Sequence, residues 1–188
     1  MDSLLRSHTV DARSVFLKQR LSSDYCAVYA AGMTLSLCGR PTDRRSAHRL
    51  FKVGTPSWRV PNHDEVCLAL EIALPGATVA LDSRRCADGL EVREWLASKL
   101  RRRRAVMVTA RCELVEPRVT ALHAFVVVRA SENRIGLLDP LGSAPRPGDD
   151  CNAWIDAVPS APRRYLAVRG APHRIDISAP LSVFDIRG

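Results

Sequence analysis

The chain has 188 residues, of which 46% are hydrophobic and 26% charged, and its formal net charge is +8 at neutral pH. This length and composition favour a folded globule with its own core, and no apolar run is long enough to predict a membrane-spanning helix. The six cysteines are widely spaced without a Cys-x-x-Cys pair, which argues against a zinc motif and against a disulfide scaffold. We expect one domain over residues 1–188 with reduced thiols, no cofactor and no metal.

The N-terminal segment and the charge distribution limit the location and the partners. Residues 1–8 contain no signal-peptide core, so we expect a cytoplasmic protein, or one exported without an N-terminal signal peptide. Arginine carries most of the positive charge, and aromatic residues, at 5%, are too few for base-stacking platforms. The one dense run, Arg101 to Arg104, follows a predicted helix and is typical of a solvated helix end. Nucleic-acid binding is therefore not expected, and an acidic protein remains an alternative partner.

A cysteine at the start of a buried helix is the first candidate functional group. Residues 1–18 form a lead-in, and small or apolar residues then recur at helical spacing from Cys26 to Leu37, until Cys38-Gly39 ends the helix. Unpaired N–H groups at a helix N-terminus favour the thiolate, so Cys26 is suited to be a nucleophile. Upstream, Gln19 could donate its amide to an oxyanion. The alternative is that Cys26 fills a core, as free cysteines commonly do.

The rest of the first half, within residues 19–104, is predicted to be mainly helical. Capping patterns predict three further helices, one beginning after Thr42 and covering Arg44 to Phe51, one beginning after Asn62, and one beginning after Asp88. Only Ala77 to Leu81 is a strand candidate in this half.

The second half, residues 105–188, is predicted to be mainly β. The expected strands are Ala105–Ala110, Ala121–Arg129, Ile135–Asp139, Tyr165–Arg169 and Leu181–Ile186, with a short helix over Asn152–Val158. A helical half followed by an antiparallel half predicts an α+β fold.

A hairpin in the second half supplies the partners for the cysteine. His123 opens one strand and Asp139-Pro140 ends the next, so an antiparallel pairing returns both side chains to the same edge of the sheet. There the carboxylate can orient one ring nitrogen and leave the other as a base. Taken singly, His123 could be held by backbone bonds and Asp139-Pro140 could be a plain turn. The agreement of the three elements favours a catalytic role for His123.

The other histidines lack such a setting. His48 lies mid-helix, His63 lies in a first helical turn, and His173 is assigned to a late loop.

This order of residues resembles the papain-like cysteine peptidases, most closely the bacterial group related to the double-glycine leader peptidases that process bacteriocins. The resemblance covers roughly residues 19–142 and rests on Asp24-Tyr25-Cys26 with its helix, on His123 with the apolar strand after it, and on Leu138-Asp139-Pro140. It implies Cys26 as nucleophile, His123 as general acid and base, Asp139 as orienting residue and Gln19 as oxyanion donor. Two departures are that Ala27 replaces the usual glycine and that the spacing from Gln19 to Cys26 is one residue longer.

The expected reaction is acyl transfer to Cys26 from a peptide or amide bond of a protein or peptide. Water would complete a peptidase, isopeptidase or deamidase reaction, and an amine would complete a transglutaminase-like reaction. The loop from Gly54 to Pro61, with Trp58, and the connection from Cys112 to Thr120 are the expected walls of the cleft. The alternative from another class is a non-enzymatic, degenerate peptidase that binds an acidic protein or nucleic acid through its basic surface.

Overall fold

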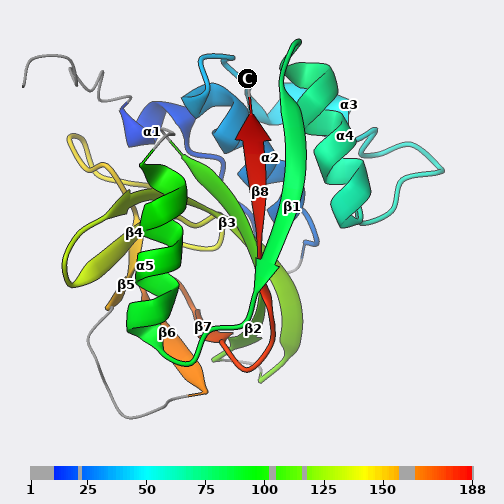
Figure 1. Cartoon of the computed structure of the whole chain (residues 1–188). Coiled ribbons are helices and arrows are strands. Elements are labelled where there is room, and N and C mark those ends of the chain that lie inside the picture. Colours follow the sequence, from blue (N-terminus) through cyan, green and yellow to red (C-terminus); the bar gives the residue numbers. More distant parts are fainter. Residues whose placement is uncertain (1–10, 21–22, 102–104, 116–117, 157–163, 188) are drawn as a thin grey trace, which may run out of the picture.

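The computed structural model describes residues 11–20, 23–101, 105–115, 118–156 and 164–187 of the chain (Figure 1). Over these residues the fold is α+β, as expected. The helices are α1 (Ala12–Val15), α2 (Cys26–Leu37), α3 (Arg44–Leu50), α4 (His63–Ala73) and α5 (Gly89–Leu100). The strands are β1 (Thr78–Arg84), β2 (Val106–Leu114), β3 (Thr120–Ala130), β4 (Arg134–Leu138), β5 (Ala153–Asp156), β6 (Tyr165–Arg169), β7 (His173–Asp176) and β8 (Leu181–Arg187).

All described strands belong to one antiparallel sheet in the order β1-β8-β2-β3-β4-β5-β6-β7. Strand β2 has two partners along its second edge, because Met107–Thr109 pair with β8 whereas Cys112–Leu114 pair with β7. The β2–β7 pairing closes β2 to β7 into a ring, and β8 and β1 extend the sheet beyond it. The sequence did not predict this closure. Because β1 joins the same sheet, the first half is not purely a helical layer.

The two faces of the sheet enclose two cores. Along β2, Val106, Val108 and Ala110 belong to a core that includes α5, whereas Met107 belongs to a core shared with α2 and α4. This alternation is the two-residue period of a strand whose faces are both covered. Figure 1 shows α5 in front of the sheet, and α1 to α4 in the upper part of the view. The α2 core is the one that positions Cys26.

Helix α2 is apolar on all sides, and small residues let its neighbours approach closely. A Cβ at Gly32 would lie 2.7 Å from Leu17 of the lead-in and 3.1 Å from Ala47 of α3. The lead-in therefore packs directly on α2, with Val15 buried. Helix α2 ends as expected, with Cys38 as its C-cap and Gly39 at φ +89°, a conformation that glycine adopts without strain.

The predicted helix starts are confirmed with one exception. The side chains of Asn62 and Asp88 cap α4 and α5, and Asn62 with Glu65 forms a complete capping box. Thr42 was wrongly expected to cap α3. Asp43 does so instead, because its carboxylate accepts a hydrogen bond of 2.7 Å from the Ser46 N–H.

Two expectations in the second half are wrong. Residues 153–156 form strand β5 rather than part of a helix over Asn152–Val158, of which residues 157 and 158 lie outside the described chain. His173 does not lie in a loop but is the first residue of β7, a strand that the sequence analysis missed. Of the run Arg101 to Arg104, Arg101 is the C-cap of α5, and the other three residues lie outside the described chain.

We predict that Gly170, in the turn that leads into β7, is needed for stability. Its φ is +89°, and a Cβ there would lie 2.5 Å from the carbonyl oxygen of Asn152. Gly148 has φ +86° with open space around it, so Gly148→Ala isolates the backbone cost of about 1–2 kcal/mol. Gly170→Ala should lower the free energy of unfolding by about 1–3 kcal/mol more, because the clash adds to that cost. Urea denaturation of both variants measures the difference, and equal losses would contradict the prediction.

Candidate active site

Cys26 lies at the first turn of α2, with its sulfur against the backbone of β3. The Sγ atom is 3.9 Å from the carbonyl oxygen of Leu122. Hydrogen bonding with the backbone of Ala27 and Ala124 also favours the thiolate. The sulfur atom therefore lies between the first turn of α2 and the backbone of β3.

His123 lies on β3 and is buried, with 5% of its surface exposed. Its Nε2 atom is 3.0 Å from Oδ1 of Asp139, which directly follows β4. Because Nε2 hydrogen-bonds the carboxylate, Nδ1 is the ring nitrogen that remains for the hydrogen bond with Cys26. The structure thus brings together the cysteine, the histidine and the aspartate that the sequence singled out.

The Asp139 carboxylate is fully buried, and the neighbouring main chain holds it in place. Its Oδ1 also accepts a hydrogen bond of 2.9 Å from the Leu141 N–H, across Pro140. Asn152 fixes the aspartate backbone, since its Oδ1 accepts from the Asp139 N–H at 2.8 Å and its Nδ2 donates to the Asp139 carbonyl at 3.0 Å. Asn152 is a supporting residue that the sequence analysis did not identify as such.

The three groups shift one another's protonation. Burial alone would raise the pKa of the Cys26 thiol, but the hydrogen bond with His123 and the charge of its ring outweigh burial and lower that pKa. Burial alone would lower the pKa of His123, but the charge and hydrogen bond of Asp139 raise it to about 10. Burial opposes ionisation of Asp139 too, yet both histidines beside it hold its pKa well below the usual range. Both shifts favour a thiolate–imidazolium pair over the neutral thiol and imidazole.

Gln19 lies beside this group but is already engaged. It is buried, its N–H donates to the Pro140 carbonyl oxygen at 2.7 Å, and its side-chain amide donates to the Ser23 carbonyl oxygen. Its Oε1 is buried and has no hydrogen-bond partner among the described residues. An amide nitrogen carries two N–H groups, so one remains for another acceptor.

Within the described residues, the remaining histidines fall into two groups. His48 pairs with the Tyr29 hydroxyl at 3.0 Å, and His63 pairs with the Thr109 hydroxyl at 2.9 Å, so both are engaged outside the Cys26 pair. His173 was set aside by the sequence analysis, yet its Nε2 lies 2.6 Å from Oδ2 of Asp139. The sequence signal for this strand is the alternation of residues from His173 to Asp176, which is too short to separate a strand from a loop.

A pocket of about 510 Å³ opens over the candidate site. Its polar lining includes Gln19, Asp24, Cys26, His123 and His173. Its remaining lining is mostly apolar, formed by Val60, Cys112, Leu114, Val119, Ala121, Leu122 and Leu141. The connection from Cys112 to Thr120 therefore contributes to the wall, as expected.

The other expected wall is only partly correct. From the Gly54–Pro61 loop, Val60 lines the pocket over Cys26. Trp58 instead lines a separate pocket beside α4, and its ring packs on Tyr25 with 5.1 Å between centroids.

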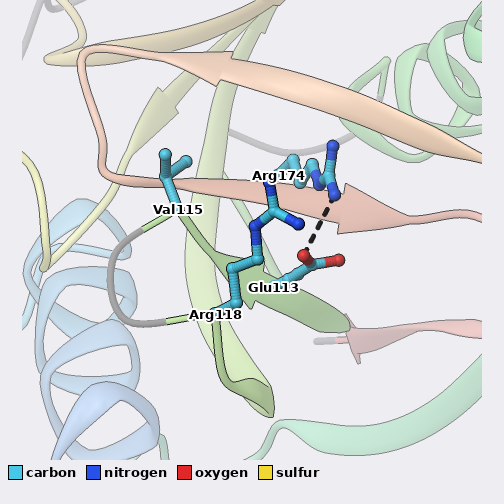
Figure 2. Close-up of a pocket in the computed structure, with 4 residues that line it drawn as sticks. All are labelled: Glu113, Val115, Arg118 and Arg174. Carbon is cyan, nitrogen blue, oxygen red and sulfur yellow. Dashed lines mark hydrogen bonds and ion pairs between the residues drawn. The ribbon is translucent and has the colours of Figure 1, made fainter.

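A third, smaller pocket lies at the end of β2, where it meets β7 (Figure 2). Arg174 donates to the Glu113 carboxylate at 3.0 Å, and the guanidinium group of Arg118 extends toward the same place. With two arginines for one glutamate, this pocket carries a net positive charge.

Three side chains of the site could approach a metal ion. One ligand atom each from His123, Asp139 and His173 lie within 4.8 Å of one another. Both imidazoles already hydrogen-bond the carboxylate, so a metal would have to displace the protons that make these bonds. The geometry fits a hydrogen-bonded acid–base group better than a metal centre.

Comparison with known proteins adds little to this geometry. No protein-family profile matches the chain, and no curated protein matches it in sequence. One solved structure, a Bacillus anthracis protein assigned as a C39-like peptidase, aligns with a TM-score of 0.46 and 12% identity, over 93% of this chain and 96% of that chain. A similarity this low does not support a conclusion about this chain. Among the described residues, no helix is long and apolar enough to cross a membrane.

We predict that Cys26 is the most reactive thiol toward iodoacetamide at pH 6–7. Its pKa is lowered, whereas burial raises the pKa of Cys86 and Cys151 to about 11 and also raises that of Cys112. As the pH falls below the ordinary thiol pKa of about 8.5, Cys26 should keep its thiolate while other thiols lose theirs.

Mass spectrometry of each cysteine after timed alkylation measures these rates. Cys38, which is exposed, serves as the internal comparison. A Cys26 rate that falls together with the Cys38 rate between pH 8.5 and pH 6 would contradict the prediction.

Proposed function

We propose that the chain is a cysteine hydrolase that cleaves a peptide or amide bond in a protein or peptide. One observation carries the proposal: the Cys26 thiol, with a lowered pKa, lies in an open pocket beside a buried His123–Asp139 pair. A cysteine that only fills a core has no need of such partners, and burial normally raises a thiol pKa.

In the proposed reaction, the Cys26 thiolate attacks the carbonyl carbon while His123 holds the proton. The tetrahedral intermediate collapses when the imidazolium gives that proton to the leaving amine, and a thioester on Cys26 remains. His123, now neutral, removes a proton from water, whose oxygen attacks the thioester. The second tetrahedral intermediate then breaks its C–S bond, which releases the acid and leaves the Cys26 thiolate beside the protonated His123. Asp139 keeps the ring oriented and stabilises its charge in both steps.

The oxyanion of the intermediate needs donors at the start of α2. The first N–H groups of a helix have no partners within the helix, so the Cys26 N–H is available there. Gln19 is the proposed second donor through the N–H that Ser23 does not use. Gln19 lines the pocket, which supports this role. Its side-chain amide already donates to Ser23, so of the four site residues Gln19 is the least free to reorient.

We further propose that the chain is a papain-like peptidase similar to the double-glycine leader peptidases, and that residues 1–188 act as one domain. The order along the chain supports the family: a nucleophile on a helix, a base on a strand and an aspartate after the next strand. The shared sheet supports the single domain, because β1 from the first half pairs along its length with β8 at the end of the chain.

The apolar walls of the pocket favour an apolar substrate side chain near the scissile bond. Leu122 and Val119 are half-exposed, at 58% and 48%, beside the catalytic pair. Burial against a substrate would remove this apolar surface from water.

The basic pocket of Arg118 and Arg174 supports a second candidate function, in which the chain binds an acidic protein without cleaving it.

Incubation with a peptide library in ¹⁸O-labelled water tests the proposal. We predict cleaved peptides with ¹⁸O in the new carboxyl group and apolar residues enriched at the cut. Cys26→Ala should reduce cleavage at least about 1,000-fold, because the nucleophile is lost. Cys67→Ala, which removes a half-buried thiol on α4, is the matched control and should keep activity.

The mass change separates the related reactions, since a deamidated peptide is not shortened and amine transfer leaves an adduct. Absence of any product that depends on Cys26 would contradict the hydrolase and favour the binding protein.

A further inference from the structure

The Asp139 carboxylate is shared between two histidines. His123 reaches Oδ1 at 3.0 Å and His173 reaches Oδ2 at 2.6 Å. The rings of the two histidines also touch each other, edge to face, with 4.7 Å between centroids. The hydrogen-bonded pair of His123 and Asp139 is thus extended by a third side chain, that of His173 at the start of β7.

The closure of the sheet delivers His173 to this place. In the β2–β7 pairing, His173 is opposite Leu114, whose side chain lines the pocket over Cys26. The side chain of His173 is completely buried and lines the same pocket. This position depends on a long-range strand pairing, so it is not a consequence of the local hairpin that brings His123 to Asp139.

The protonation of His173 follows from its partner. An ionised carboxylate only accepts hydrogen bonds, so Nε2 of His173 must carry the proton that lies between them. Its Nδ1 atom is buried and has no partner among the described residues. Asp139 is therefore the one polar contact that the structure shows for this ring.

Such a residue is a poor choice for stability alone. Burying an imidazole whose second nitrogen lacks a partner costs free energy, and an apolar side chain of similar size would avoid that cost. What the imidazole supplies, and an apolar residue cannot, is a donor to Oδ2 of Asp139.

We propose that His173 is a positioning residue that fixes the Asp139 carboxylate so that Oδ1 faces His123. The inference rests on the proposed function of Cys26 and His123. With His173 in place, rotation of the carboxylate would break two hydrogen bonds on Oδ1 and one on Oδ2. Without it, Oδ2 is a charged oxygen with no partner in a buried site, and the carboxylate holds the imidazolium less firmly.

Several titratable groups around the carboxylate affect any pH readout. They are His123 on β3 and His173 on β7, which hydrogen-bond the carboxylate, and the buried Cys112 on β2, which is itself influenced by Cys26 on α2 and Asp176 on β7. The pKa of Cys112 is raised by burial, and that of Asp176 is lowered by Arg164 and Ser178 against the effect of burial. Both shifts move these pKa values away from the range between pH 5 and pH 7, so neither group is expected to contribute to a change there.

The test compares variants by the rate of Cys26 alkylation with iodoacetamide from pH 5 to pH 9. In His173→Leu, the acid limb of the profile should move upward by about one pH unit, which makes the reaction about tenfold slower at pH values below the wild-type midpoint. His173→Gln should restore most of the rate, because its amide nitrogen can donate from nearly the position of Nε2. A merely structural role would not move the limb or allow this rescue.

Two further variants keep the test decisive. His63→Leu removes another imidazole, one that hydrogen-bonds Thr109 and not Asp139, and should leave the pH profile unchanged. If His173→Leu does not fold, His173→Asn replaces it, because its shorter amide cannot reach Oδ2 as the glutamine does. Thermal unfolding of each variant shows which ones are folded.

The outcomes separate the inference from the proposed function. If Cys26 is activated in the wild type, loses activation in His123→Ala, and is indifferent to His173→Leu, the inference is overturned and the hydrolase stands. A glutamine variant that is folded but no better than leucine or asparagine also overturns the inference. If wild-type Cys26 is not activated, the proposed function and the inference fall together.

Discussion

The buried carboxylate of Asp139 is the group on which the rest of the site depends. A charge without access to water is costly, and in proteins it persists only where hydrogen bonds and an opposite charge offset that cost. Here His123, His173 and the Leu141 N–H supply the hydrogen bonds, and the imidazolium of His123 supplies the charge. The sheet therefore has to bring β3, β4 and β7 to one point, which the β2–β7 pairing achieves.

The same carboxylate explains why the six cysteines differ. The thiols of Cys86, Cys112 and Cys151 are surrounded by apolar groups or by carboxylates, and these conditions raise their pKa. Cys26 is also substantially buried, but it faces an imidazole that Asp139 keeps protonated. Position at the start of a helix contributes to its activation. The larger difference comes from a partner about one hundred residues away in the chain.

The features that could be predicted from the sequence are local. The helix after Cys26, the capping box at Asn62 and the hairpin that joins His123 to Asp139 all depend on neighbouring residues or on adjacent strands. Such features leave a period or a cap in the sequence.

The features that were missed depend on distant pairings. Strands β5 and β7 have four residues each, and the residue pattern of so short a strand was too weak to separate from a helix or a loop. The roles of Asn152 and His173 follow from where those strands pair, which no local pattern contains. The direction of the Gln19 side-chain amide is likewise set by its hydrogen bond to the Ser23 carbonyl oxygen, and the Pro140 carbonyl oxygen holds the Gln19 backbone N–H.

The protonation state of His123 tests the account most directly. A pH titration of the histidine rings by NMR, with His48 as an internal comparison, would measure it. The account predicts that His123 stays protonated through neutral pH and titrates at a pKa of about 10, whereas burial and the charge of Arg44 keep the pKa of His48 below its usual value. A His123 that loses its proton near the ordinary histidine pKa of about 6.5 would contradict the thiolate–imidazolium pair and, with it, the proposed chemistry.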